Sequence, residues 1–331
     1  MPGEFDLIKR IRDRAARTTD NLIKGIGDDC AIISGREGFD TLISCDLLVE
    51  DKHFCLSYTP PRSLGHKTLA VSISDIAAMG GNPRFCTLSL AIPSHITDQF
   101  LDEFFVGLLA LADRYGVVLI GGDTSASPDK FVIDLNIIGE SPAGQAIRRD
   151  GAKSGDLIYV TGDLGASAAG LKLLQRGYSP VLRSPNQIEE LMNLAIESHL
   201  QPTPRVEIGQ ILLGLEVVTS MIDISDGLSS DLNHICEESQ VGAIVYASAI
   251  PVSPSIATIK QDGLQTALNG GEDYELLLTV NPASRDRIET IGEVIPITCI
   301  GEITSTGKMF LRNSQDQMQA LTPSGFDHFS E

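Results

Sequence analysis

Acidic residues recur beside glycine and small polar residues at six points along this 331-residue chain, and this recurrence constrains the fold most strongly. The segments are Gly27-Asp28-Asp29, Ser44-Cys45-Asp46, Ser74-Asp75, Gly122-Asp123-Thr124, Asp223-Ile224-Ser225-Asp226-Gly227 and Gly270-Gly271-Glu272-Asp273. Asp beside Gly is ordinary turn chemistry, so one such segment is weak evidence for function. Several of them end apolar runs, however, and apolar strands deliver their terminal side chains to a common edge of a sheet. Carboxylates gathered there would repel one another unless divalent cations lay between them.

Asp75 is the least ordinary of these acidic residues. It falls inside segment 62–79, whose apolar residues have helical spacing, and Asp is a poor residue for a helix interior. Its neighbours Ser72 and Ser74 are small enough to let a charged ligand approach, although simple solvent exposure would explain Asp75 equally well. Oxygen ligands suit magnesium, manganese or calcium rather than zinc. Magnesium, in turn, indicates nucleotide phosphates.

The remaining pattern predicts an α+β protein of two α/β domains with mixed sheets. Strands are expected at 41–46, 117–120, 131–138, 156–160, 217–224, 242–247, 274–280 and 297–303. Helices are expected at 62–79, 100–115, 187–199, 205–213 and 228–238, with glycine turns at 80–83 and 121–124. The small and polar segment 141–154 predicts a boundary between an N-terminal domain, residues 1–140, and a C-terminal domain, residues 150–331.

The charge balance restricts the possible partners. Acidic residues number 44 and basic residues 25, giving a net charge of −19. Such a surface repels nucleic acid and anionic membranes, so a phosphate-bearing substrate would need bridging cations. No stretch approaches the roughly 20 apolar residues that cross a bilayer, and the charged N-terminal segment lacks the apolar centre of a signal peptide. We therefore expect a cytoplasmic protein.

Several common motifs are missing from the chain. The six cysteines form no C-x-x-C pair, which favours reduced thiols over a disulfide or zinc site. Neither the G-x-x-x-x-G-K-[ST] loop nor the protein-kinase motifs occur. An ATP enzyme of this sequence would hold phosphates mainly through metal ions and glycine-turn amides. A non-catalytic acidic calcium-binding protein is an alternative, although no EF-hand loop supports it.

Eight motifs, in order, resemble the thiamine-monophosphate kinase family. They are residues 3–8, 25–31, 44–46, 53–54, 74–80, 121–124, 223–228 and 270–275. The resemblance extends to residue 329 and so covers nearly the whole chain. It implies the ATP-binding fold shared with aminoimidazole-ribonucleotide synthetase and selenophosphate synthetase, with N-terminal domains paired in a homodimer. It also implies phosphoryl transfer from ATP to thiamine monophosphate, giving thiamine diphosphate.

The resemblance further implies three groups of site residues. Several magnesium ions would be held by Asp29, Ser44, Cys45, Asp46, Asp75, Asp123, Asp223 and Asp226. ATP would contact Phe105, Gly122, Asp123, Arg149 and Ser225, and thiamine monophosphate would contact His53, Glu272 and Phe326. Phe326 would stack on a substrate ring and Glu272 would attract the positive thiazolium. The family usually has threonine where Cys45 stands, so the backbone carbonyl of Cys45 is the expected ligand.

The acceptor in this reaction is a phosphate monoester whose second pKa is about 6, so it is mostly dianionic at neutral pH. It needs no general base, and we expect direct in-line transfer with no phosphoenzyme and no catalytic side chain. Two relatives in the same superfamily are alternatives. A hydrogenase-maturation dehydratase would need a C-terminal cysteine, whereas this chain ends in Ser330-Glu331. A selenophosphate synthetase would need a reactive cysteine in an N-terminal glycine-rich segment, whereas the first cysteine is Cys30.

Overall fold

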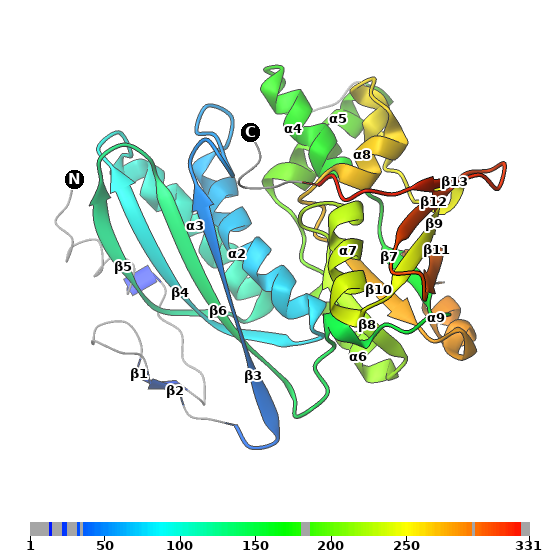
Figure 1. The fold of residues 1–331 in the computed structure, drawn as a ribbon. Coiled ribbons are helices and arrows are strands. Elements are labelled where there is room, and N and C mark those ends of the chain that lie inside the picture. Colours follow the sequence, from blue (N-terminus) through cyan, green and yellow to red (C-terminus); the bar gives the residue numbers. More distant parts are fainter. Residues whose placement is uncertain are drawn as a thin grey trace. The chain divides into compact units, whose positions relative to one another are not determined.

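The computed structural model describes residues 13–14, 22–24, 32–33, 36–179, 186–292 and 295–325. The chain divides into two compact units, drawn from blue to green and from green to red in Figure 1. Unit 1 comprises Met1–Ile76 and Gly81–Gln145, and unit 2 comprises Ala77–Gly80 and Ala146–Glu331. Two predicted site residues, Asp29 and Phe326, lie outside the described residues. Within the described part of the chain, no helix has the length and apolar character needed to cross a membrane.

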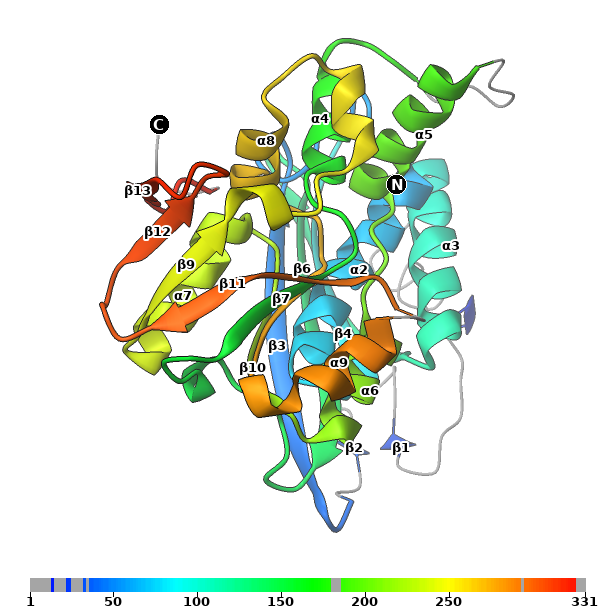
Figure 2. The same cartoon turned by 90° about the vertical axis from the view of Figure 1, so that its right-hand side faces the viewer.

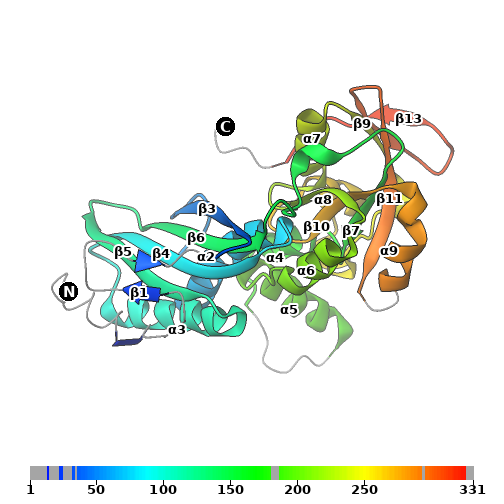
Figure 3. The same ribbon diagram turned by 90° about the horizontal axis from the view of Figure 1, so that it is seen from below.

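Unit 1 contains a four-stranded mixed sheet with two long helices on one face (Figure 3). Its elements are β1 (Leu22–Lys24), β2 (Ile32–Ile33), β3 (Phe39–Val49), α2 (Pro61–Ala78), β4 (Asn82–Pro93), α3 (Asp98–Tyr115), β5 (Val118–Ser127) and β6 (Val132–Pro142). The strand order is β3-β6-β4-β5, in which β4 and β5 are parallel and the other pairs antiparallel. Strands β1 and β2 form a separate antiparallel pair.

The two faces of the unit 1 sheet differ in burial. Ile133, Leu135 and Ile137 of β6 are fully buried, and their β3 partners Leu48, Asp46 and Ser44 share that face. The intervening β3 residues Ile43 and Leu47 point to the other face, where they are 72% and 55% exposed. Because side chains alternate along a strand, Ser44 and Asp46 lie on the face that is packed against the helices.

Unit 2 contains a seven-stranded mixed sheet of order β13-β12-β9-β11-β7-β10-β8, and Figure 2 labels its strands from β13 to β10. Its strands are β7 (Leu157–Thr161), β8 (Val218–Asp223), β9 (Gly242–Tyr246), β10 (Leu276–Val280), β11 (Ile297–Thr304), β12 (Met309–Arg312) and β13 (Met318–Ala320). Its α-helices are α4 (Ala166–Gln175), α5 (Gln187–Leu200), α6 (Val206–Leu215), α7 (Leu228–Ser239), α8 (Gly263–Asn269) and α9 (Arg285–Gly292). Short 3-10 helices are η1 (Arg149–Gly151), η2 (Ala247–Ala249), η3 (Pro254–Thr258) and η4 (Pro282–Ser284).

Strand β10 shows that the unit 2 sheet is packed on both faces. All five of its residues are buried. Leu277 belongs to a core that includes residues of α7 and α8, whereas Leu276 and Leu278 belong to a core that includes residues of α6 and α9. The predicted α+β class with two mixed sheets is confirmed.

One predicted turn is wrong. Residues 121–124 continue strand β5 to Ser127 instead of ending it, because they pair with β4, a strand that the sequence pattern did not predict. Gly122 has φ 154°, and a Cβ atom placed on it would lie 1.8 Å from the carbonyl oxygen of Leu88. Glycine at 122 therefore permits a close approach between two strands rather than a turn.

Candidate functional site

Four polar residues of unit 1 form a cluster, which we call the unit 1 cluster: Ser44 and Asp46 of β3, and Ser72 and Asp75 of α2. The Ser44 hydroxyl donates to the Asp75 carboxylate, and the Ser72 hydroxyl donates to Oδ2 of Asp46 at 2.6 Å. Residues two apart on a strand and three apart on a helix share a face, so both pairs meet. Asp75 is only partly exposed, so simple solvent exposure does not explain it.

The electrostatics of the unit 1 cluster favour a bound cation. Burial, followed by the charges of Asp75 and Asp134, raises the pKa of the Asp46 carboxyl to about 6, although the Ser72 hydrogen bond acts in the opposite direction. The site thus places ionisable carboxyl groups close together in a partly dehydrated position. Its donor atoms are carboxylate and hydroxyl oxygens, the ligands that magnesium prefers. These residues therefore fit the predicted metal.

Two other predicted metal ligands lie elsewhere on the same sheet. Cys45 is exposed and, by strand alternation, its side chain points to the face opposite Ser44 and Asp46. Asp123 of β5 is exposed, pairs in register with Ser89 of β4, and accepts a 2.9 Å hydrogen bond from the backbone N–H of Thr124. The same register continues from Ser89 to Asp134 and from Asp134 to Leu47 of β3, so Asp123 lies on the face of the sheet opposite Ser44 and Asp46.

Two further predicted residues of unit 1 have contrasting environments. Phe105 is 2% exposed in α3 and packs edge-on against Phe104, with ring centroids 5.4 Å apart. It is part of the core, and we leave it out of the proposed ATP site. His53 is partly exposed, and its Nδ1 accepts a 2.9 Å hydrogen bond from the backbone N–H of Val49. In neutral His53 the proton therefore sits on Nε2.

In unit 2, the two acidic motifs lie side by side. Strands β8 and β10 are antiparallel, and their backbone pairing continues beyond the strand ends. Ile224 N–H donates to Glu275 O at 2.8 Å, and Glu272 N–H donates to Ser225 O at 2.7 Å. A Cβ atom on Gly271 would lie 2.6 Å from the same Ser225 oxygen. The fold thus brings Ser225, Asp226 and Glu272 together, although Asp226 and Glu272 are 46 positions apart in the chain.

A buried carboxyl group that the sequence analysis did not identify lies behind Asp226. Asp231 of α7 is 1% exposed, and its Oδ2 accepts hydrogen bonds from the backbone N–H groups of Asp226 (3.2 Å) and Gly227 (3.0 Å). Asp226, Asp231 and His234 each offer one ligand atom within 4.8 Å of the others. One sequence signal could have identified Asp231. It is an acidic residue in the first turn of the helix that follows Ser225-Asp226-Gly227, a position that the helix dipole favours.

The stability of the metal-free protein should depend on Asp231. Burial, together with the charges of Asp223 and Asp226, raises the pKa of Asp231 to about 8, although hydrogen bonds from the backbone N–H groups of Asp226 and Gly227 act in the opposite direction. Because this folded-state pKa exceeds the ordinary value of 3.8, ionisation is easier in the unfolded chain. The associated stability is complete below about pH 4 and is lost as the pH rises to about 8, by on the order of 5 kcal/mol.

Thermal unfolding in a chelator at pH 5.5, 6.5 and 7.5 measures this dependence. Asp231→Asn should flatten the decline of the unfolding midpoint with pH, because its side chain cannot ionise. Asp316→Asn is the control, since the Asp316 side chain is 90% exposed. Equal slopes in the two variants would contradict the prediction.

Neighbouring acidic residues of the second motif have different partners. The Asp273 carboxylate accepts hydrogen bonds from the backbone N–H groups of Gly165 (2.6 Å) and Ser167 (3.3 Å), so it caps the start of α4. The Glu275 carboxylate is paired with the Arg205 guanidinium and accepts from the Thr161 hydroxyl at 2.6 Å. Both residues therefore have structural partners.

The other two predicted contacts in unit 2 are Arg149 and Phe326, of which the structure describes only Arg149. Arg149 is exposed in η1, where its carbonyl oxygen accepts a 2.8 Å hydrogen bond from the hydroxyl of Ser239. Phe326 follows Gly325 directly. The Gly325 N–H donates to Ser230 Oγ at 3.0 Å, and a Cβ atom on Gly325 would lie 2.2 Å from the carbonyl oxygen of Asp226. The chain immediately before Phe326 thus lies against the acidic motif.

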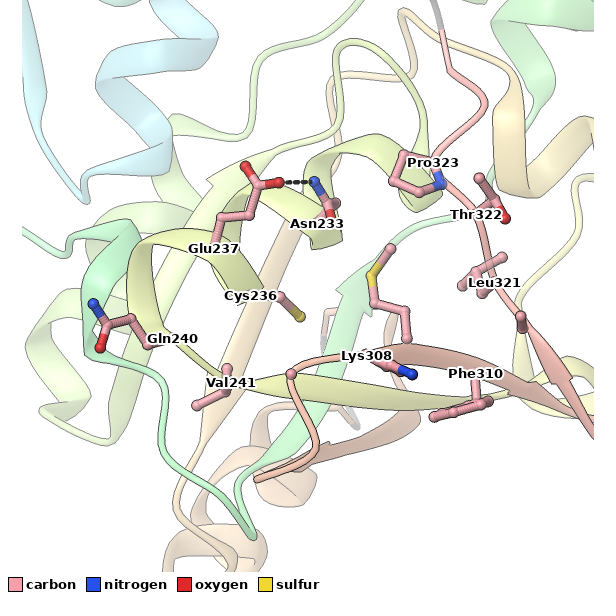
Figure 4. A pocket seen from close by; sticks show the side chains of 13 residues that line it. Asn233, Cys236, Glu237, Gln240, Val241, Lys308, Phe310, Leu321, Thr322 and Pro323 are labelled. Carbon is pink, nitrogen blue, oxygen red and sulfur yellow. Dashed lines mark hydrogen bonds between the residues drawn. The ribbon is translucent and has the colours of Figure 1, made fainter.

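A separate pocket of about 590 Å³ lies beside the C-terminal half of α7 (Figure 4). Its lining combines apolar side chains such as Val241 and Leu321 with Lys308 and a hydrogen-bonded pair, Asn233 and Glu237. None of the predicted site residues lines it. The pocket is therefore distinct from the two acidic motifs of unit 2, residues 223–227 and 270–273.

Comparisons of the sequence with known proteins agree with one another. Residues 27–141 match the family model described as AIR synthase related protein, N-terminal domain, and residues 153–312 match the corresponding C-terminal domain. A thiamine-monophosphate kinase of Salmonella typhimurium is 42% identical over 334 residues, covering 99% of this chain and 98% of its own. That of Bacillus subtilis is 38% identical over 330 residues, covering 98% and 99%.

Solved structures give the same result. A thiamine-monophosphate kinase from Stenotrophomonas maltophilia K279a superposes with a TM-score of 0.82 at 37% identity, covering 93% of this chain and 96% of that one. AaThiL complexed with AMPPCP and TMP gives 0.78 at 28% identity, covering 99% and 97%. Hydrogenase maturation protein HypE in complex with ATP, at 19% identity and a TM-score of 0.75 over 96% and 94%, shows a similar fold.

Proposed function

The chain belongs to the thiamine-monophosphate kinase family of AIR synthase-related proteins, and on that premise we propose that its acidic clusters hold magnesium for phosphoryl transfer. The predicted membership of this family is confirmed. The chain carries out the family's reaction, in which ATP phosphorylates thiamine monophosphate to thiamine diphosphate. The observation that carries the metal proposal is a pair of hydrogen bonds between β3 and α2. The Ser44 hydroxyl orients Asp75, and the Ser72 hydroxyl orients Asp46.

Each unit has its own set of proposed metal ligands. In unit 1 these are Ser44, Asp46, Asp75 and Asp123, with Asp29 and the Cys45 carbonyl completing the predicted set; in unit 2 they are Asp223 and Asp226. Bound magnesium would supply the positive charge that offsets repulsion between two polyanions and aligns them for in-line attack. Ser44 and Ser72 fix the orientation of the carboxylates by donating hydrogen bonds to them.

The proposed ATP contacts are Gly122, Asp123, Arg149 and Ser225. Gly122 precedes Asp123 on β5 and has no side chain. Its backbone is therefore accessible to a phosphate group, which supports the proposed contact. Arg149 is exposed and supplies a cation in a chain of net charge −19. Ser225 lies between Asp223 and Asp226, so a phosphate beside it would also be near the proposed metal ligands.

The proposed contacts of thiamine monophosphate are His53, Glu272 and Phe326. Neutral His53 carries its proton on Nε2, which suits donation to a phosphate oxygen. Glu272 supplies negative charge for the thiazolium, and Phe326 follows a residue that lies against Asp226.

We also propose that the protein is a homodimer paired through the exposed face of the unit 1 sheet, where Ile43 and Leu47 are exposed apolar residues.

Transfer is proposed to be direct, because the dianionic phosphate of the acceptor is itself the nucleophile. The hydroxyl–imidazole contact of Ser167 and His199 does not suggest a phosphoenzyme, since both residues are less than 5% exposed. Detection of a phosphorylated protein on the reaction path would contradict direct transfer.

The choice of acceptor tests the proposed mechanism. With ATP and magnesium, we expect thiamine diphosphate from thiamine monophosphate and no phosphorylated product from free thiamine, whose hydroxyl would need a general base. Chromatographic separation of the products measures both reactions in parallel. Comparable turnover of free thiamine would overturn the requirement for a dianionic acceptor.

A further inference from the structure

We propose that His199 is a positioning residue that fixes the Glu272 carboxylate for the positively charged half of thiamine monophosphate. The inference rests on the proposed function, in which Glu272 contacts that half of the substrate. His199 lies at the end of α5 and is 4% exposed. Its Nδ1 lies 3.1 Å from Oε2 of Glu272 and 3.1 Å from Oγ of Ser167.

The chemistry of these three groups determines which atom carries the proton. An ionised carboxylate can only accept hydrogen bonds, so Nδ1 must carry the proton that lies between His199 and Glu272. The Ser167 hydroxyl, 1% exposed in the first turn of α4, shares the same Nδ1. A buried imidazole with its proton on Nδ1 can thus orient the carboxylate by donating a hydrogen bond to it.

The backbone of the Glu272 segment is also constrained. Glu272 and Tyr274 have φ values of 66° and 51°, a left-handed conformation that is strained for residues other than glycine. The Glu272 N–H is bonded to Ser225 O, and the adjacent Asp273 caps α4. These contacts hold the Cα atom of Glu272 in place, while its side chain can still rotate about its own bonds. The contact with His199 restricts that rotation.

The nature of the substrate makes this positioning consequential. A thiazolium ring has a delocalised positive charge and no N–H group, so it cannot select a carboxylate by donating a hydrogen bond. Its attraction to Glu272 depends on where the negative charge lies. A carboxylate that is already oriented binds the cation without first losing side-chain freedom.

Replacement of His199 by three residues separates positioning from simple packing. His199→Ala should raise KM for thiamine monophosphate about tenfold, the usual effect of losing a hydrogen bond to a charged group, with kcat and KM for ATP within twofold of the parent. His199→Asn should restore most of the loss, because its amide N–H₂ occupies the place of Nδ1. His199→Gln should not, because its amide lies one bond further from the backbone. A loss of kcat and of ATP affinity that Asn does not restore would show a structural role and overturn the inference.

A double-mutant cycle with Glu272→Gln separates this inference from the proposed function. If His199 acts through Glu272, His199→Ala should raise KM little further in the Glu272→Gln background. If Glu272→Gln leaves KM unchanged, the proposed substrate contact of Glu272 fails. If Glu272→Gln raises KM but His199→Ala does not, the substrate contact stands and the positioning role of His199 fails. The unfolding midpoint of each variant checks that it is folded.

Discussion

Asp75→Asn should reduce turnover of thiamine monophosphate by at least about a thousandfold, the scale expected when a group that stabilises transition-state charge is lost, while the protein remains folded. An asparagine oxygen can still accept the hydrogen bond from Ser44, so the local geometry is kept. The substitution removes a negative charge that helps to raise the pKa of Asp46. The unfolding midpoint of the metal-free protein should therefore stay the same or rise.

Steady-state turnover across a magnesium titration, together with thermal unfolding, measures both effects. Asp113→Asn is a matched control, because Asp113 is an exposed acidic residue on the neighbouring helix α3. Near-normal activity of Asp75→Asn at ordinary magnesium concentrations would remove Asp75 from the metal site. Loss of activity together with a large drop in the unfolding midpoint would assign Asp75 a structural role instead.

Gly122→Ala should destabilise unit 1 by about 3 kcal/mol or more, at the upper end of what overpacking usually costs. The added methyl group would meet the carbonyl oxygen and carbon of Leu88 at 1.8 and 2.6 Å. These are backbone atoms of the paired strand β4, so no side-chain rotation can relieve the contact. Strands β4 and β5 would have to separate next to Asp123.

Gly121→Ala is the matched control, since nothing lies within 4 Å of a Cβ atom at that position. It should leave stability nearly unchanged, because alanine reduces only the freedom of the unfolded chain. Urea unfolding of the two variants, with ATP affinity measured on the folded protein, distinguishes them. Equal stability of the two variants would show that the close approach of β4 does not require glycine at position 122.

The elements with a clear periodicity were predictable from the sequence. The pattern predicted a helix at 100–115, and α3 spans Asp98–Tyr115 with an αL residue, Gly116, at its end. Strand β4 was missed because it begins with Asn82-Pro83 directly after two glycines, a combination that usually marks a turn. Without β4, residues 121–124 have no visible partner, and two glycines before an Asp favour a turn.

The two acidic residues at 272 and 273 show what sequence order cannot decide. They are adjacent in the chain and chemically alike, yet the Asp273 carboxylate caps a helix 108 residues away, whereas Glu272 contacts His199. Asp231 likewise has an ordinary position in a helix. Only the structure shows that its carboxylate accepts a hydrogen bond from the backbone N–H of Asp226. These roles depend on pairs of residues that are close only after the two motifs have packed together.

The sequence by itself therefore determined the family, the α+β class and most of the carboxylates proposed to hold metal. Motifs and periodicity are properties of residues a few positions apart, and hydrophobic burial acts on them directly. Only the tertiary structure decided that Ser44 meets Asp75 and Ser72 meets Asp46, which lie 31 and 26 residues apart. The physical reason is that a hydrogen bond requires two groups within about 3 Å, and only packing of the helix on the sheet brings these pairs that close.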